Sequence, residues 1–171
     1  MVLRGPESSF PTDPIGATEL PEIARTGANA VRILTKIQPA SGLTLDHLEA
    51  RIAGALDQGM IPLLWVNDGS GPNNTILRPD VVELIKRYED KVLLDCFAEP
   101  AYDDRARWLN DAKSAIAAFR NAGYEAPLYC MTNKFGRDLP AALQYGQEIV
   151  DSDPLDNTII GWQAYWGDND T

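Results

Sequence analysis

Glu99 is the residue whose position in the sequence most clearly suggests chemistry, because it ends an apolar run directly before Pro100. The run KVLLDCFAE, residues 91–99, is typical of a buried strand, and proline stops strands. Parallel sheets usually gather their active sites at the carboxyl ends of the strands. A partly buried carboxylic acid there can hold a proton near neutral pH. Glu99 is therefore a catalytic candidate, and the alternative is a strand-end carboxylate paired with an arginine.

Arg32 lies inside a second apolar stretch, ANAVRIL at residues 28–34. A charged side chain there needs a carboxylate partner whichever way it points. A structural ion pair and the support of a catalytic carboxylate are both open for it. Asp68, at the end of a neighbouring strand, is the best candidate for a second carboxylate near Glu99, although an aspartate in a loop is also a common turn former.

Aromatic residues gather near the end of the chain, at Trp162, Tyr165 and Trp166. Aromatic faces can cover the apolar side of a sugar ring, and Trp65 and Phe135 could join these residues. Strand alternation places Trp162 and Trp166 on one side of a strand and Gln163 and Tyr165 on the other. If Tyr165 faces a cleft, Trp162 is expected to pack under a helix.

Composition restricts the possible partners. The 171 residues are 44% hydrophobic and 23% charged, as in one globular domain. The net charge of -10 opposes binding to a nucleic acid. No apolar run approaches the ~20 residues of a membrane span, so no membrane partner is expected. The opening MVLRGPESSF has no apolar core, so we expect no signal peptide, and the compartment stays open.

No metal or other cofactor is expected. Cys96 and Cys130 both lie in apolar runs, which favours buried free thiols over a disulfide. The lone histidine, His47, lies on a helical face, so a zinc site has too few ligands. The loop residues Gly69 to Gly71 do not form a nucleophile elbow, because no histidine base is available.

Strand and helix patterns alternate along the whole chain. Apolar runs bounded by turn residues predict strands, and apolar residues at helical spacing predict helices. The predicted strands are residues 1–5, 28–34, 60–66, 91–99, 126–132 and 157–166. The predicted helices are residues 17–27, 44–59, 78–90, 105–123 and 139–152.

This alternation implies right-handed parallel crossovers with helices covering the sheet. A doubly wound sheet would usually carry a glycine-rich turn after its first strand, and RGPESSFPTDP at residues 4–14 lacks that spacing. A complete barrel needs eight strands and about 250 residues. The expected fold class is therefore α/β: a TIM-barrel-type sheet of about six parallel strands and five helices, forming an incomplete barrel.

The order of short motifs resembles glycoside hydrolase family 5, in particular its bacterial β-mannanase and cellulase-like members. IARTGANAVRI, VNDGSG, FAEP and NAGYEAPLYCMT fall in the order of the family's second to fifth strands. The resemblance implies that Glu99 is the general acid/base and that Arg32 lies near the nucleophile. The other residues that it places in the substrate site are Asn67, Asp68, Gln163, Tyr165 and Trp166.

Several positions depart from the family pattern. Ala98 stands where the family has the asparagine that precedes its acid/base. Asn67 and Gln163 stand where the family has two histidines. The nucleophilic glutamate of the family's seventh strand has no counterpart, because the chain stops at Thr171, after the sixth strand. Retaining hydrolysis uses two carboxylates about 5–5.5 Å apart. We therefore expect weak or no turnover.

The expected protein is a single domain over residues 1–171 that lacks the last two βα units of a barrel. By resemblance, it is a β-glycan hydrolase-like protein for mannan- or cellulose-type chains, with Glu99 as general acid/base. The alternative is a non-catalytic barrel remnant that binds carbohydrate or self-associates. The open edges of strands one and six predict a homo-oligomer, unless the terminal segment GDNDT covers an edge.

Overall fold

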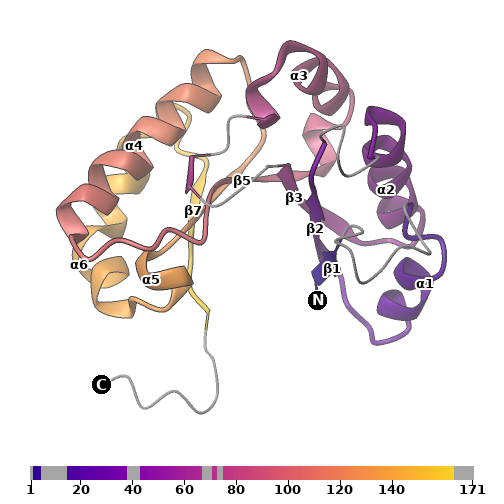
Figure 1. The fold of residues 1–171 in the computed structure, drawn as a ribbon, viewed down its shortest axis with the longest axis horizontal. Helices are drawn as coiled ribbons and strands as arrows, with labels where there is room; N and C mark the ends of the chain where they lie inside the picture. Colours follow the sequence, from indigo (N-terminus) through magenta and orange to yellow (C-terminus); the bar gives the residue numbers. More distant parts are fainter. Residues whose placement is uncertain (1, 5–14, 38–42, 67–70, 73–74, 164–171) are drawn as a thin grey trace.

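The computed structural model describes residues 2–4, 15–37, 43–66, 71–72 and 75–163, and it shows one curved sheet with helices around its outer side (Figure 1). Six strands are parallel in the order β1-β2-β3-β5-β6-β7, and the two-residue strand β4 pairs antiparallel with β5. The strands are β1 (Val2–Arg4), β2 (Ala30–Thr35), β3 (Ile61–Val66), β4 (Gly71–Pro72), β5 (Leu93–Ala98), β6 (Leu128–Met131) and β7 (Thr158–Gly161).

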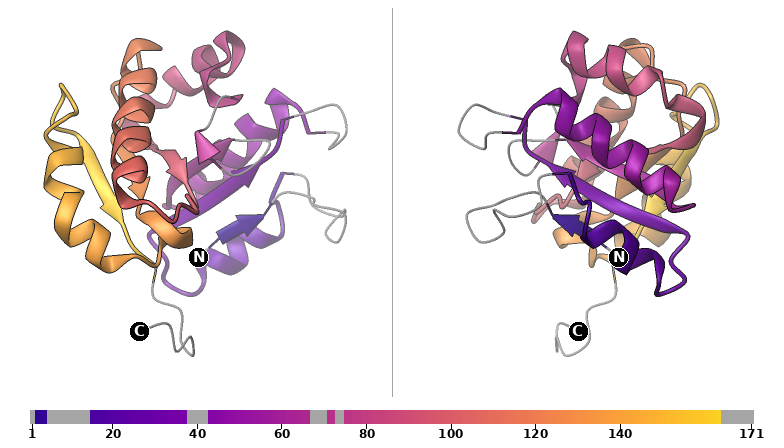
Figure 2. Two further views of the ribbon diagram at one scale, coloured as in Figure 1. Left: turned by 60° about the vertical axis from the view of Figure 1, so that its left-hand side comes forward. Right: turned by 90° about the vertical axis from the view of Figure 1, so that its right-hand side faces the viewer.

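Helices follow the strands and form the outer layer. The helices are α1 (Glu19–Ala24), α2 (Leu45–Asp57), α3 (Pro79–Lys86), α4 (Arg105–Asn121), α5 (Asn133–Gly136) and α6 (Leu139–Val150). Two 3-10 turns, Thr75–Leu77 and Glu89–Lys91, flank α3. Figure 2 shows the same arrangement from two other sides.

Helix α2 shows how the local sequence sets these elements. Thr44 caps its first turn in a reciprocal arrangement with His47, in which each residue's side chain accepts a hydrogen bond from the other's backbone N–H. Leu48 and Ile52 recur at helical spacing and are fully buried. Gly59 follows the helix with a φ of 73°, a left-handed conformation that glycine adopts without a steric penalty. The sequence therefore bounds the helix at both ends.

Contacts between α2 and β2 show which face of the sheet the helices cover. The fully buried Arg51 of α2 donates hydrogen bonds to Thr35 Oγ1 at 3.1 Å and to the carbonyl oxygen of Leu34 at 3.2 Å. Thr35 therefore faces the helical layer. Because side chains alternate along a strand, Arg32 and Leu34 face the opposite, concave side.

The core lies between the sheet and the helices. Buried strand residues such as Val31, Ile33 and Leu64 pack against buried helix residues such as Ile52 and Ile116. On the concave side, no helix of the described residues covers the sheet (Figure 1). The side chains of Ile61 and Ile159 lie on that open side, because they alternate with neighbours that face the helices. They are 49% and 47% exposed, respectively.

The predicted α/β barrel-type architecture is confirmed, including its parallel strands and five main helices, α1, α2, α3, α4 and α6. The sheet is open in the described part of the chain, and three short elements were not predicted: the strand β4, the 3-10 turn Thr75–Leu77 and the helix α5. In the residues described, none of the helices has the length and apolar character needed to cross a membrane.

The last predicted strand, residues 157–166, is shorter than expected. Strand β7 ends at Gly161, whose carbonyl oxygen accepts a hydrogen bond from Thr132 N–H. Gln163 N–H then donates to the carbonyl oxygen of Gly136, in the turn after β6, at 2.7 Å. The chain therefore leaves the sheet at Trp162 because this turn takes over its hydrogen bonds.

Candidate active site

Glu99 follows the last residue of β5 and stands at the carboxyl edge of the sheet. The pairing of β5 with β6 shifts by one residue between Asp95 and Phe97, which interrupts the regular alternation of side chains. Glu99 itself has a φ of 49°, in the left-handed region that non-glycine residues rarely adopt. Its side chain is 36% exposed. The sequence feature behind this geometry is Pro100, which ends the strand.

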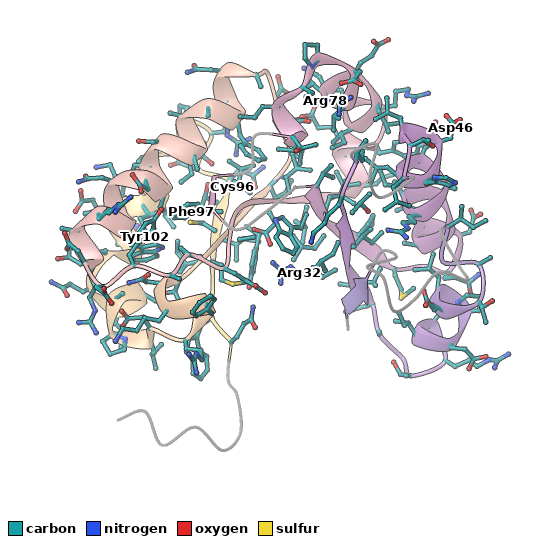
Figure 3. All side chains as sticks on the ribbon, viewed as in Figure 1. Arg32, Asp46, Arg78, Cys96, Phe97 and Tyr102 are labelled. Atoms are coloured by element: carbon teal, nitrogen blue, oxygen red, sulfur yellow. The ribbon has the colours of Figure 1, made fainter. Side chains whose placement is uncertain are left out.

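Arg32 joins Glu99 to a second carboxylate. Its Nη2 lies 2.6 Å from Asp95 Oδ2, and its Nη1 lies 3.7 Å from Glu99 Oε1. The strand register explains why Arg32 and Asp95 are close. Arg32 pairs with Leu63, and Leu63 pairs with Leu93, which is two residues before Asp95. Figure 3 shows the labelled Arg32 on the inner side of the arch.

Asp95 is fully buried, and Arg32 is 11% exposed. Burial raises the pKa of Asp95 to about 6, while the adjacent Arg32 guanidinium lowers it and the negative charge of Glu99 raises it. Sequence reasoning missed Asp95 as the principal partner of Arg32. The available signal was that Asp95 is the one charged residue in the run VLLDCFA.

Three buried polar atoms of this site have no hydrogen-bond partner in the described part of the chain: Arg32 Nε, Asp95 Oδ1 and Trp65 Nε1. The Trp65 ring lies beside the arginine, with 5.3 Å between Arg32 Cζ and the ring centroid. Buried polar groups are almost always satisfied by protein, water or ligand. These three atoms surround the Arg32–Asp95 pair on the inner side of β2, β3 and β5.

Gln163 is described, and it lies at the end of β6 rather than in a strand. Its Nε2 lies 3.1 Å from Met131 Sδ. Trp162, which was expected under a helix, is instead 48% exposed, because β7 ends one residue before it. The predicted site residues Asn67, Asp68, Tyr165 and Trp166 lie outside the described residues.

No group of three or more histidine, cysteine, aspartate or glutamate side chains could hold an ion within the described ranges. Cys96 and Cys130 are both buried and free, as predicted. A hydrogen bond with Cys130 and burial both raise the pKa of the Cys96 thiol, so this thiol is held in its neutral form.

No model of a known protein family matches the chain. Among characterised proteins, it is 25% identical over 162 residues to a mannan endo-1,4-beta-mannosidase of Salipaludibacillus agaradhaerens, covering 87% of this chain and 51% of the relative. It is also 27% identical over 88 residues to the beta-mannanase/endoglucanase A of Caldicellulosiruptor saccharolyticus, covering 50% of this chain and 7% of the relative.

Solved structures agree with these similarities. The β-mannanase of Thermomonospora fusca superposes with a TM-score of 0.80 at 21% identity, over 96% of this chain and 58% of that enzyme. Its complex with mannohexaose gives a TM-score of 0.79 at 22% identity, over 97% of this chain and 61% of that one. A family 5 cellulase from an Icelandic hot spring isolate gives 0.61 at 14% identity, over 93% and 53%.

The chain thus spans about half the length of the S. agaradhaerens mannosidase. The similarity extends from β1 to β7, so it includes the strand that ends at Glu99 and the strand that carries Arg32. The resemblance to family 5 glycoside hydrolases is confirmed: this chain is a glycoside-hydrolase-like protein with the fold of the bacterial β-mannanases.

Proposed function

We propose that this protein binds β-1,4-linked glycan, of mannan or cellulose type, across the carboxyl ends of its strands, with Glu99 as the general acid/base. The observation that carries the proposal is the position of Glu99, which a left-handed backbone directs toward Arg32 at the edge of the sheet while leaving the carboxylate 36% exposed. An acid/base must reach both water and the glycosidic oxygen, and the exposure of Glu99 permits this.

The known relatives support the choice of substrate class. One curated relative is a mannan endo-1,4-beta-mannosidase, and solved complexes of the T. fusca β-mannanase contain mannohexaose and mannotriose. In the proposed reaction, Glu99 gives its proton to the glycosidic oxygen as the bond breaks and later takes a proton from water. Arg32 keeps the carboxylate of Glu99 in place.

A second carboxylate is needed for retaining hydrolysis. Asp95, the other carboxylate that the structure places at Arg32, is fully buried and bound to the guanidinium at 2.6 Å. A carboxylate in that position cannot attack a sugar. The nucleophile must therefore be another carboxylate, and Asp68, the candidate from the sequence, lies outside the described residues. We accordingly propose slow turnover for the chain alone.

The second candidate function is carbohydrate binding without hydrolysis. It is favoured by Ala98, which directly precedes Glu99 where the resembled enzymes have an asparagine that bonds the sugar's 2-hydroxyl. Both functions predict binding, and they differ in whether Glu99 is needed for bond cleavage.

Reducing-sugar release from mannan, cellulose and mixed-linkage glucan tests the proposal. Loss of a positioned acid/base commonly costs about 10²–10⁴-fold, so Glu99→Gln should lower any hydrolysis by that factor while leaving binding in place. Hydrolysis that persists in Glu99→Gln would exclude Glu99 as the acid/base. Binding with no detectable cleavage by either form would favour the second candidate.

A further inference from the structure

Glu99 has a backbone conformation that the local sequence opposes. Its φ of 49° lies in the left-handed region, which costs a residue other than glycine free energy. The next residue is Pro100, and a proline favours an extended conformation in the residue before it. A conformation of this kind persists only where surrounding contacts enforce it. Those contacts must act on the chain on either side of Glu99.

The sheet fixes the chain that leads into Glu99. Strand β5 pairs with β6, and Ala98, the last residue of β5, also pairs with Gly71 of β4. The side chain of Phe97 is completely buried in the core. The backbone before Glu99 therefore cannot move without breaking strand pairs, and a change in the conformation of Glu99 requires the residues after it to move.

The residues after Glu99 are tied to the turn between β6 and α6, residues 132–138. Asn133 in this turn is fully buried, and its side chain both accepts a hydrogen bond from Tyr102 N–H and donates one to the carbonyl oxygen of Tyr102, each at 2.8 Å. Phe135 N–H donates to the carbonyl oxygen of Pro100, also at 2.8 Å. Asn133 therefore makes two of the three hydrogen bonds that fix residues 100–102.

The ring of Tyr102 is held separately from its backbone. It stacks on Phe97 with 6.1 Å between the ring centroids, and Figure 3 shows these two labelled residues close together. Arg107 of α4 lies over the same ring, with 4.8 Å between its Cζ and the ring centroid. These contacts orient the side chain of Tyr102, whereas Asn133 sets the position of its backbone.

The turn that carries Asn133 is itself rigid. Thr132 Oγ1 donates a hydrogen bond to the carbonyl oxygen of Asp138 at 2.8 Å, and Arg105 makes two hydrogen bonds to the Asp138 carboxylate. The middle of the turn is closely packed, because a Cβ added at Gly136 would lie 2.9 Å from the Sδ atom of β6 residue Met131. Asn133 is therefore a fixed point to which the chain after Glu99 is attached.

We propose that Asn133 is a positioning residue for Glu99. By holding the backbone of Tyr102, it keeps Glu99 left-handed, with Oε1 3.7 Å from Arg32 Nη1. Without the Asn133 side chain, residues 100–102 can shift and Glu99 can relax to the extended conformation that Pro100 favours. The carboxylate then leaves its place beside Arg32. The consequence for catalysis rests on the proposed function, whereas the effect on the backbone does not.

A comparison of two substitutions at position 99 tests the role without any sugar. Glu99→Gly and Glu99→Ala both remove the carboxylate, and only glycine adopts a left-handed backbone without steric cost. In the otherwise wild-type chain, Glu99→Gly should therefore have a higher urea midpoint than Glu99→Ala. When Asn133→Ala is added to both, this advantage should disappear. An advantage of equal size with and without Asn133→Ala, or none in the otherwise wild-type chain, would overturn the proposal.

Thr158→Val is the matched control for a general loss of stability. It also removes a buried hydrogen bond, from Thr158 Oγ1 to Asp153 Oδ2 at 2.7 Å, but at the start of β7. When it is combined with the two substitutions at position 99, Glu99→Gly should keep its advantage. If Asn133→Ala does not fold, Asn133→Ser replaces it, because a serine hydroxyl is too short to make both hydrogen bonds to Tyr102.

Reducing-sugar release from mannan measures the consequence for catalysis. Misplacing a catalytic group by about 1 Å can cost about 10²-fold, so Asn133→Ala should lower kcat by about that factor and leave KM unchanged, and Thr158→Val should change neither. If cleavage depends on Glu99 but not on Asn133, the positioning role is wrong and the proposed function stands. If the wild type cleaves no glycan, hydrolysis fails as the function, and the comparison at position 99 still decides the role of Asn133.

Discussion

Arg32 and Asp95 form an ion pair across the inner side of the sheet, with 2.6 Å between Nη2 and Oδ2. Asp95 is completely buried and Arg32 nearly so, which makes each charge dependent on the other. The same guanidinium lies 3.7 Å from Glu99. The charge network under the proposed acid/base is therefore built into the sheet.

Arg32→Met should strongly destabilise the protein at neutral pH. The substitution leaves Asp95 buried without its cation, and breaking such a pair typically costs about 3–5 kcal/mol in the free energy of unfolding. Urea denaturation at pH 7 measures the change. Arg78→Met is the control, because Arg78 and Asp80 are 45% and 44% exposed, and an exposed pair contributes about 1 kcal/mol or less. Equal, small losses in both variants would contradict the account.

Asp95 should also make stability depend on pH. Its pKa is raised to about 6 by burial, with Arg32 and Glu99 as the charged groups that act on it. Between about pH 4 and pH 6 the folded chain retains the Asp95 proton and the unfolded chain releases it, so this group's contribution to stability falls as pH rises. Relative to Asp95→Asn, the wild type should lose about 2 kcal/mol of unfolding free energy from pH 4 to pH 7.

Asp153 is the control for that titration, because its pKa is shifted in the opposite direction from that of Asp95. Hydrogen bonds from Arg120 lower the pKa of Asp153 below its usual range. Its contribution is therefore fully present above about pH 4 and is lost as pH falls further. The difference between wild type and Asp153→Asn should stay constant from pH 5 to pH 7. If the difference in unfolding free energy between wild type and Asp95→Asn is also constant from pH 5 to pH 7, then Asp95 titrates normally.

Replacing Lys134 with glycine should stabilise the protein. Lys134 is exposed and left-handed, with a φ of 52°, and glycine adopts that conformation without steric cost. We expect a gain of about 1 kcal/mol in thermal or urea unfolding. Ala117→Gly, at an exposed position within α4, should instead lose about 1 kcal/mol. A loss at both positions would mean that the turn is not strained.

We further predict self-association through the open edges of the sheet, in the region of β1 and β7. In the described sheet, β1 and β7 each pair with one neighbouring strand, and Ile159 of β7 is 47% exposed. Light scattering during size exclusion should give at least twice the 18.8 kDa chain mass. Ile159→Lys should lower that mass, while Leu143→Lys, on the 79% exposed Leu143 of α6, should not. A monomer at high concentration would contradict this prediction.

Local patterns were sufficient to predict the helices and the parallel order of the strands. Helix α2 illustrates the reason, because its apolar spacing and the glycine after it lie within one continuous segment. The position of Glu99 at a strand end could also be predicted, from the apolar run before it and from Pro100 after it.

Features that depend on contacts between distant segments could not be predicted. Asp95 pairs with Arg32 because of the register of three strands and a shift beside β6, and none of these is encoded locally. The early end of β7 depends on the 132–138 turn, whose left-handed residues Lys134 and Phe135 carry no distinctive signal of their own. Within this turn, glycine, the usual residue in such a conformation, occurs only at Gly136.

A crystal structure of the Glu99→Gln variant with mannohexaose would test the central claim most directly, because this variant should bind the sugar without cleaving it. The account predicts a sugar chain across the carboxyl ends of the strands, with a glycosidic oxygen about 2.6–3.2 Å from the substituted side chain. An oligosaccharide bound on the helical side of the sheet, or one whose glycosidic oxygens all lie far from position 99, would contradict it.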